Sequence, residues 1–289
     1  MAATHTPPDI WLKAAHQAIQ NALAEDVGAG DHSTLAVIDT SATGKAQLLV
    51  KQPGILAGIE AARLVFGQVD KNLRLKTYKK DGDPVQSGDI AFVLSGPVRS
   101  ILTAERLALN ILQRMSGIAS QTHKLMQLIA DTPTQLLDTR KTTPNFRVFE
   151  KWAVRIGGGH NHRFGLYDMI MLKDNHIDFA GGITPAVKKV RKYLADRHLN
   201  LRIEVETRTL DEVAEALAAG VEVIMLDNMS LADMRQAVTL IDHTCQTEAS
   251  GNITAENIRA VARTGVDYIS MGALTYGYPS LDMSLKAVF

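Results

Sequence analysis

LRIEVETRTLDEVAEALAAGVEVIMLDN, residues 201–228, contains one complete strand–helix–strand unit and is the clearest indication of this chain's architecture. Two short apolar runs, LRIEVET and VIMLDN, flank an amphipathic stretch that starts with a capping box of Thr209 and Glu212 and ends at Gly220. Two strands joined by a helix of this length run parallel, with a right-handed connection. The segment therefore predicts an α/β fold.

The same alternation of strand and helix continues on both sides of this unit. After Thr132 the strand candidates are TQLLDTR, YDMIMLK, LRIEVET, VIMLDN, CQTEAS and YISMGAL. The residues at their carboxyl ends are, in chain order, Arg140 and Lys141, Lys173, Glu204 and Glu206, Asp227, Ser250, and Gly272. A barrel brings all such strand ends to one mouth, whereas the outer strands of an open sheet lie too far apart to share one site. Because there are six candidates and not eight, we expect a short or incompletely closed barrel.

The first 130 residues have a different pattern. Residues 9–28 have helical periodicity, while residues 44–60 and 73–96 indicate short strands separated by PG, DG and SG turns. A long helix is predicted from about Ser100 to Ala130. Since these strands adjoin turns and not helices, this part is expected to be organised separately from the barrel.

The composition is typical of a soluble globular protein, with 46% hydrophobic and 21% charged residues. The 31 basic and 31 acidic residues cancel, so no overall field favours nucleic acid or an anionic membrane. Cys245 is the only cysteine, which excludes an intrachain disulfide and indicates a small buried strand residue in a reducing compartment. No apolar run approaches the ~20 residues of a membrane span. The N-terminal MAATHTPPDIW lacks a signal-peptide pattern, so a cytoplasmic location is expected.

Positive charge is concentrated between Asp138 and Lys173, where seven basic residues face three acidic ones. Three of the basic residues recur every four positions along one predicted helix and indicate a solvated face: Arg147, Lys151 and Arg155. Four others lie at strand ends or in the glycine-rich loop GGGHNHR: Arg140, Lys141, Arg163 and Lys173. Such convergence is unfavourable unless an anion binds there, and arginine forks suit carboxylates while lysine suits phosphate. Ion pairing with neighbouring loops is the structural alternative.

The acidic strand ends indicate a magnesium site. Glu204 and Glu206 alternate along one strand and therefore share a face, and Asp227 ends the next strand. Carboxylates from adjacent strand ends suit Mg²⁺, which keeps part of its water and is shared with substrate phosphates. One of the two glutamates is expected only to hold a basic neighbour, and the sequence leaves open which one.

Small residues follow the last two predicted strands. Ser250, Gly251 and Asn252 end one strand, with Thr254 placed to cap the next helix, and Gly272 and Ala273 end the other. Backbone N–H groups in such turns can reach a phosphate, and barrels often bind phosphate between the loops after their last two strands. These two turns therefore predict a phosphate site.

The glycine-rich region also allows two other interpretations, a transition-metal site and the Schiff-base site of an aldolase. A transition-metal site is disfavoured because the HNH sequence matches no metal-ligand spacing and no cysteine lies nearby. His176 is expected to cap a helix or pack in a loop. A barrel aldolase would place a Schiff-base lysine at a strand end, as Lys173 is placed, but it would not require the arginine cluster.

The motifs, taken in order, resemble the quinolinate phosphoribosyltransferase family over nearly the whole chain. The matching segments are EDVGAGDHST, TAERLALNILQRMSGIAS, LLDTRKTTPNFR, GGGHNHRFGLYDMIMLKDNHI, IEVET, MLDNMS, EASGNIT and MGALT. This resemblance implies transfer of the 5-phosphoribosyl group from phosphoribosyl diphosphate to quinolinate with decarboxylation, which yields nicotinate mononucleotide, CO₂ and pyrophosphate in NAD biosynthesis. It also implies an α/β sandwich domain at 1–116, completed by 275–289, and an incomplete six-stranded α/β barrel of TIM-like type at 117–274.

The resemblance also implies roles for single residues. Arg140, His162, Arg163 and Lys173 would hold the quinolinate carboxylates and the adjacent ribose phosphates, and Arg106 would enter from the other subunit of a homodimer. The sequence leaves open whether such dimers assemble into a hexamer. Lys141 would contact phosphoribosyl diphosphate, and Glu206 and Asp227 would meet the ribose hydroxyls and Mg²⁺. Ser250, Gly251, Gly272 and Ala273 would surround the 5′-phosphate. Catalysis itself is assigned to Lys141, Lys173, Glu206 and Asp227.

Two positions depart from the family pattern. Asn252 stands where relatives often have glycine, and Tyr276 stands where histidine or lysine is expected, which puts diphosphate contacts near that loop in question. A molybdenum-transport-linked paralogue of the same fold remains an alternative to the transferase. The intact NHR and LKDNH motifs argue against it.

Overall fold

The computed structural model describes residues 9–288, which divide into two compact units. The sandwich unit comprises Met1–His123, Lys141–Gly158 and Ala273–Phe289, and the barrel unit comprises Lys124–Arg140 and Gly159–Gly272. Residues 141–158 thus group with the sandwich unit, although they lie inside the domain predicted at 117–274.

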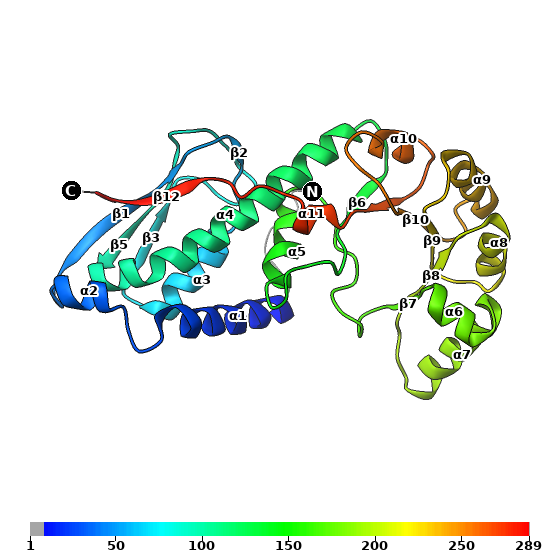
Figure 1. Cartoon of the computed structure of the whole chain (residues 1–289), viewed down its shortest axis with the longest axis horizontal. Coiled ribbons are helices and arrows are strands. Elements are labelled where there is room, and N and C mark those ends of the chain that lie inside the picture. Colours follow the sequence, from blue (N-terminus) through cyan, green and yellow to red (C-terminus); the bar gives the residue numbers. More distant parts are fainter. Residues whose placement is uncertain (1–8, 289) are drawn as a thin grey trace. The chain divides into compact units, whose positions relative to one another are not determined.

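The sandwich unit is built on a four-stranded sheet in the order β12-β1-β5-β3, in which the neighbouring strands are antiparallel. The strands are β1 (Thr43–Val50), β3 (Arg74–Thr77), β5 (Ile90–Pro97) and β12 (Met283–Val288), and a small second sheet pairs β2 (Gly54–Ile55) with β4 (Pro84–Val85). The helices are α1 (Asp9–Val27), α2 (His32–Val37), α3 (Ile59–Val69), α4 (Val98–Leu128), α5 (Arg147–Ile156) and α11 (Ala273–Tyr276). Helix α3 lies along one side of the main sheet, and β12 brings the C-terminal segment back beside β1 (Figure 1).

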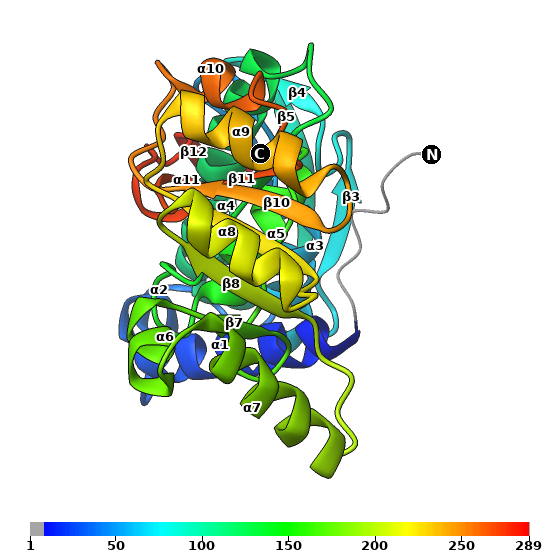
Figure 2. The same ribbon diagram turned by 90° about the vertical axis from the view of Figure 1, so that its right-hand side faces the viewer.

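The barrel unit is a parallel six-stranded sheet in the order β6-β11-β10-β9-β8-β7. Its strands are β6 (Gln135–Leu137), β7 (Ile170–Leu172), β8 (Ile203–Thr207), β9 (Val223–Asp227), β10 (Gln246–Ser250) and β11 (Tyr268–Ser270). Its helices are α6 (Asp174–Ala180), α7 (Ile183–Asp196), α8 (Leu210–Ala218), α9 (Leu231–Ile241) and α10 (Ile258–Ala262). The helices cover the outer side of the curved sheet (Figures 1 and 2), so its inner face is left for a site.

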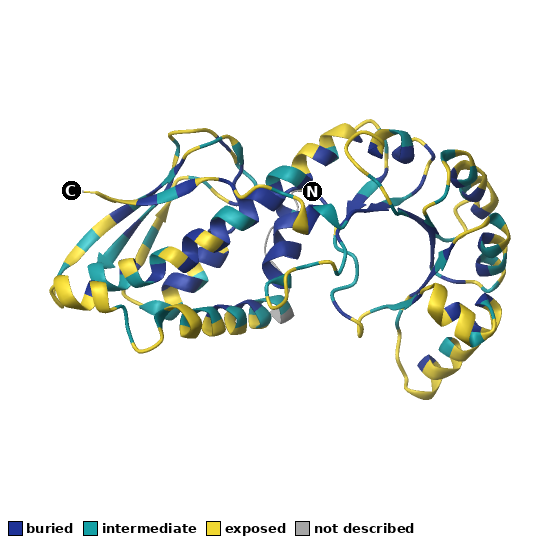
Figure 3. Cartoon of the chain, viewed as in Figure 1, coloured by how far each residue is buried: buried dark blue, intermediate teal, exposed yellow. Residues whose placement is uncertain are grey.

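The strand order places the first strand, β6, beside the last, β11, as in a barrel, while β7 remains an edge of the sheet. The curved sheet stays open between β7 and β6 (Figure 3). On the β6 side of this opening, an isolated parallel bridge joins Leu137 to His160. The prediction of an incompletely closed six-stranded α/β barrel is confirmed.

Along β8, alternate residues point to the two faces of the sheet. Ile203 and Val205 are buried on the helix-covered face, while Glu204 and Glu206 point into the barrel. The same alternation places Glu248 on the inner face of β10. The carboxyl groups inside the barrel therefore lie at two depths, with Glu204 and Glu248 below and Glu206 nearer the carboxyl ends of the strands.

The sequence predicted all six barrel strands and the long helix α4, but missed the helices α2, α3, α6 and α11 and misjudged one face of α5. Helix α6 follows β7 directly, and His176 caps it by accepting the N–H of Lys173 at 3.1 Å, one of the two roles expected of His176. The prediction of a solvated face on α5 is wrong, because Lys151 is fully buried and Arg155 stacks 6.0 Å from the ring of Trp11. Among the described residues, none of the helices is long and apolar enough to cross a membrane.

Candidate active site

The loop that contains the NHR motif is tied to the end of β6. Asp138, fully buried, donates its N–H to the carbonyl of His160 at 3.2 Å, and His160 donates its own N–H to the carbonyl of Leu136 at 2.8 Å. One carboxylate oxygen of Asp138 accepts the N–H of His162 at 2.9 Å, and the other accepts the side-chain amide of Asn161. Asp138 therefore fixes this loop, a role that the sequence analysis did not assign although Asp138 directly follows the strand.

His162 uses both ring nitrogens inside the barrel. Its Nδ1 accepts the backbone N–H of Arg163 at 2.7 Å. Its Nε2 lies 2.8 Å from Oε2 of Glu204 and 3.5 Å from Oε2 of Glu248. The ring thus connects two strands, β8 and β10, to the loop held by Asp138.

Glu204 and Glu248 are both almost completely buried, at 0% and 1% exposure. Burial raises the pKa of Glu204 to about 7, an effect that its contact with Glu248 and the charge of Arg163 partly offset. Burial, reinforced by the charge of Glu204, raises the pKa of Glu248 to about 8. The two carboxyl groups therefore favour sharing a proton at neutral pH, because burial and mutual repulsion oppose the ionisation of both.

Arg163 provides the positive charge of this region. Burial and then the neighbouring charge of Arg140 lower the pKa of Arg163, while Glu204 and Asp168 act in the opposite direction. Its guanidinium donates to the carbonyl of Met169 at 3.3 Å and lines a cavity of about 180 Å³ with the ring of His162. Two close guanidinium groups repel each other, so the pair favours a bound anion.

The upper part of the barrel is more open. Lys173 donates its ammonium to Oε2 of Glu206 at 2.8 Å, and the two side chains are 48% and 11% exposed. Asp227 accepts the side-chain amide of Asn228 at 2.8 Å. The ion pair engages Lys173 with a carboxylate, which indicates a role in charge binding and disfavours the aldolase interpretation.

The turn after β10 depends on contacts with Asn228. A Cβ at Gly251 would lie 2.2 Å from Oδ1 of Asn228, and the φ of Gly251 is 94°, so this position requires glycine. Asn252, at φ 50°, donates its side-chain amide to the same oxygen at 2.9 Å. The following helix α10 starts at Ile258, so the prediction that Thr254 caps it is wrong. The turn, and not a helix N-terminus, offers the backbone N–H groups here.

The segment that contains Lys141 belongs to the sandwich unit and is anchored there. The carbonyl of Lys141 accepts the hydroxyl of Thr275 at 2.7 Å, and the N–H of Thr143 donates to the buried carboxylate of Glu150 at 3.0 Å. Arg114 pairs with Glu150 at 2.5 Å and contacts the hydroxyl of Thr143. Lys141 thus projects from a backbone with fixed contacts on both sides.

Family models match most of this chain. The model described as "Quinolinate phosphoribosyl transferase, C-terminal domain" matches residues 118–286, and the model of the N-terminal domain of the same enzyme matches residues 31–116. This chain belongs to the quinolinate phosphoribosyltransferase family. The predicted family membership is confirmed, and the molybdenum-linked paralogue has no support.

Several proteins similar in sequence or structure align with nearly all of this chain. A chloroplastic nicotinate-nucleotide pyrophosphorylase (carboxylating) of Arabidopsis thaliana is 47% identical, covering 93% of this chain and 81% of that protein. A mitochondrial quinolinate phosphoribosyltransferase (decarboxylating) of Nicotiana glauca is 44% identical, with 93% and 81% covered. The crystal structure of NadC from Streptococcus pyogenes has a TM-score of 0.90 at 42% identity and covers 98% of this chain and 99% of that chain. The last comparison confirms the predicted fold class.

The predicted site residues of this phosphoribosyltransferase divide between the two units. The barrel unit brings most of them to the carboxyl edge of one sheet: Arg140, His162, Arg163, Lys173, Glu206, Asp227, Ser250, Gly251 and Gly272. The sandwich unit contains Arg106, exposed on α4, together with Lys141 and Ala273. Sequence reasoning left Glu248 without a role, although Glu248 is the first residue of the EASGNIT motif.

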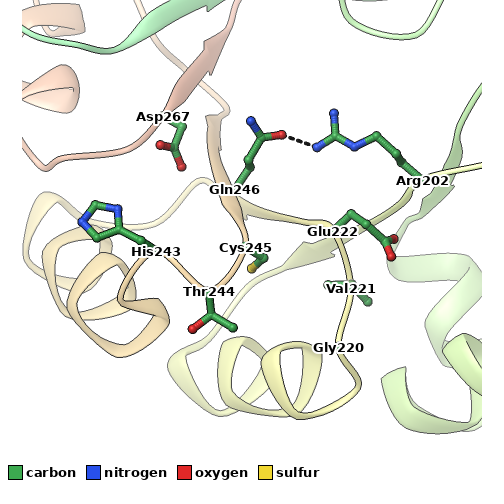
Figure 4. A pocket seen from close by; sticks show the side chains of 9 residues that line it. All are labelled: Arg202, Gly220, Val221, Glu222, His243, Thr244, Cys245, Gln246 and Asp267. Carbon is green, nitrogen blue, oxygen red and sulfur yellow. Dashed lines mark hydrogen bonds between the residues drawn. The ribbon is translucent and has the colours of Figure 1, made fainter.

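A second pocket lies at the amino edge of the same sheet and shares Arg202 with the cavity that His162 and Arg163 line. It measures about 540 Å³, and its charged residues Arg202, Glu222 and Asp267 stand just ahead of β8, β9 and β11. Figure 4 shows Gln246 bonded to Arg202 beside Cys245. The prediction that Cys245 is a buried strand residue is wrong, because it is half-buried and precedes β10; burial raises the pKa of its thiol.

Proposed function

We propose that this chain transfers the 5-phosphoribosyl group from phosphoribosyl diphosphate to quinolinate and releases CO₂ and pyrophosphate, yielding nicotinate mononucleotide for NAD biosynthesis. The family membership carries this proposal, together with Arg163, which lines the barrel cavity and feels the charge of Arg140. Two guanidinium groups match the two adjacent carboxylates of quinolinate, because each fork can bind one planar carboxylate in a bidentate manner. Lys173 adds a third positive charge at the mouth.

Carboxylates at the mouth provide the charge that the transfer needs. As pyrophosphate leaves, positive charge develops at the anomeric carbon of the ribose, and Glu206 and Asp227 are placed to stabilise it. Lys141 would neutralise the departing diphosphate. The pyridine nitrogen of quinolinate attacks, so the chain must align two substrates and needs no nucleophile of its own.

The decarboxylation follows from the product of this transfer. Once the ring nitrogen carries the ribose, the pyridinium accepts the electron pair released when the adjacent carboxylate leaves as CO₂, and a proton then replaces it on the same carbon. Arg163 and Arg140 would hold the remaining carboxylate and keep the ring in place.

We propose that Glu206 and Asp227 also hold Mg²⁺ together with phosphoribosyl diphosphate. Both offer hard carboxylate oxygens near the mouth, where a cation can keep part of its water, and this donor set fits magnesium. Bound there, the ion would neutralise diphosphate charge. Glu204 fits less well, since its carboxylate is buried and engaged with His162.

The 5′-phosphate is assigned to the turns after β10 and β11, at Ser250, Gly251, Gly272 and Ala273. The conformation of Gly251 keeps the first turn tight and without a side chain, which supports this assignment. Asn252 is engaged with Asn228 in this turn, and Tyr276 is 65% exposed at the end of α11.

We further propose that the working form is a cytoplasmic homodimer, with a hexamer as the larger assembly, in which Arg106 completes the partner's site. Mixing an Arg106→Ala chain with an Arg163→Ala chain tests the shared site. Hybrid dimers would contain one site with both arginines intact, so activity should return on mixing two inactive variants. Sedimentation of the wild type would establish the assembly state, and fractionation of cells the location.

The function is tested by incubating the protein with phosphoribosyl diphosphate, Mg²⁺ and either quinolinate or nicotinate, and assaying nicotinate mononucleotide and CO₂. Product from quinolinate alone supports the proposal. Product from nicotinate alone would overturn the two-carboxylate assignment, and no product from either by the folded protein would contradict the transferase. Omission of Mg²⁺ in the presence of a chelator should abolish turnover.

A further inference from the structure

The ring of His162 has a defined tautomer. Its Nδ1 accepts the N–H of Arg163 at 2.7 Å, so Nδ1 holds a lone pair and not a proton. The proton of the neutral ring is therefore on Nε2, which faces Oε2 of Glu204 at 2.8 Å. With both nitrogens engaged inside the protein, the ring has no donor left to bind a substrate carboxylate.

A metal ion does not fit this cluster. His162, Glu204 and Glu248 each place one potential ligand atom within 4.8 Å of the others. Binding through Nε2 would, however, move the ring proton to Nδ1, where it would face the N–H of Arg163 as a second donor. The arrangement is that of a hydrogen-bonded chain and not of a coordination site.

The carboxyl pair behind the ring is unfavourable as mere packing. Among residues 9–288, Oε1 of Glu204 and Oε1 of Glu248 are buried side-chain atoms that meet no donor from another residue, so only a proton held between the two carboxyls can serve them. Two buried carboxyls that must share a proton beside a predicted substrate residue cost stability and call for a functional reason. The reason lies in the contact between the ring of His162 and the main chain of Arg163.

We propose that Glu248 is a positioning residue, which with Glu204 holds the ring of His162 in its Nε2–H form so that the ring fixes the main chain of Arg163. This inference rests on the proposed function, because Arg163 is the group assigned to the quinolinate carboxylate. It gives His162 a supporting role in place of the direct substrate contact that the family resemblance implied.

The main chain at this point has two anchors. Asp138 accepts the N–H of His162 at 2.9 Å, and the ring of His162 accepts the N–H of Arg163 at 2.7 Å. Glu248 contacts the ring from β10 and Glu204 from β8, so a shift of either strand residue reaches Arg163 through the ring. A displacement of about 1 Å in a group that orients substrate can lower the rate ~10²-fold.

Paired substitutions at Glu248 test this inference. Glu248→Gln keeps a donor toward Glu204, so it should hold the KM values of both substrates within about threefold. Glu248→Leu removes that donor and should raise the KM for quinolinate at least about tenfold, with the KM for phosphoribosyl diphosphate unchanged. Cys245→Ser, just ahead of the same strand, is the matched control and should change neither KM.

An equal rise of both KM values in Glu248→Leu, or no rise at all, would overturn the positioning role. A Glu248→Gln variant as impaired as Glu248→Leu would also contradict it, because the effect would then depend on the carboxyl group itself. If the wild type fails to use quinolinate, the proposed function fails before any variant is compared.

The tautomer can be measured without activity. In ¹⁵N NMR of the wild-type protein at neutral pH, His162 should give one protonated nitrogen, Nε2, and one unprotonated nitrogen, Nδ1, before and after addition of quinolinate. A protonated Nδ1, or a change of tautomer when quinolinate binds, would contradict the inference even if Glu248→Leu does not fold.

Discussion

Glu204 and Glu206 lie on the same face of the same strand, with one residue between them, yet their surroundings differ. Glu204 is fully buried, bonds the ring of His162, and has its pKa raised to about 7 by burial. Glu206 is partly exposed and pairs with Lys173, whose side chain is 48% exposed. The difference shows that depth along one barrel strand separates a carboxylate that supports the site from one that can meet a substrate.

The neighbouring strand β10 repeats this arrangement. Glu248, at the deeper position, faces the same ring, whereas Ser250 lies at the carboxyl end beside the glycine turn. The barrel therefore has a buried polar layer below its mouth. Both glutamates hold a basic neighbour, His162 for Glu204 and Lys173 for Glu206, so the assignment of the substrate contact to the more exposed Glu206 stays a prediction.

The largest expected effect is a loss of catalytic rate on substitution of a carboxylate at the mouth of the barrel. Glu206→Gln removes a carboxylate that stabilises developing positive charge, so kcat should fall about 10²-fold or more while the unfolding temperature changes little. Steady-state kinetics and calorimetry check this together. A kcat within about threefold of the wild type would remove the proposed distinction between the two glutamates.

A smaller effect, on stability and pH, is expected in the buried layer. The folded-state pKa of Glu248, about 8, exceeds its unfolded value of 4.5, so its contribution to stability is complete below pH 4.5 and is lost as pH rises toward 8. The Glu248→Gln variant has no titrating group at this position. Its free energy of unfolding should therefore fall less over this pH range than that of the wild type, by an amount on the order of 1 to 3 kcal/mol.

Denaturant unfolding of both proteins at pH 5.5 and pH 8.5 measures this difference, and Cys245→Ser again serves as the control. Glu204 still titrates in the variant, so some pH dependence should remain. An identical pH dependence in wild type and Glu248→Gln would show that the carboxyl pair does not hold its proton as the structure indicates.

The smallest expected effect concerns Asp81, a buried carboxylate far in sequence from the barrel. Asp81 accepts the N–H of Ile59 at 2.8 Å and so caps α3, whose own N-cap, Gly58, offers no side chain. Asp81→Ala should destabilise the protein by about 1 kcal/mol, since the cap is lost, and should leave both KM values unchanged. A change in either KM would show that burial of a carboxylate alone does not identify a structural role.

Much of this architecture could be predicted from local sequence. The alternation of apolar runs and amphipathic stretches after Thr132 gave the six strands and their parallel order, because periodicity reflects which face of each element is buried. The cationic cluster was evident for the same reason, since residues at strand ends share one edge in such a fold. Helix α6 was missed because its seven residues are too few to establish a helical period.

The sequence by itself therefore predicted the family and the open six-stranded barrel, which are confirmed, and a set of residues at the strand ends whose roles stay predictions. Only the tertiary structure decided how deep each of them lies: that Lys151 is buried, that Gly251 must avoid Asn228, and that Glu248 meets His162. These facts depend on contacts between residues far apart in the chain. Local pattern specifies which face of a strand is buried, whereas depth, pKa and hydrogen-bond partner are set by neighbouring strands that fold against it.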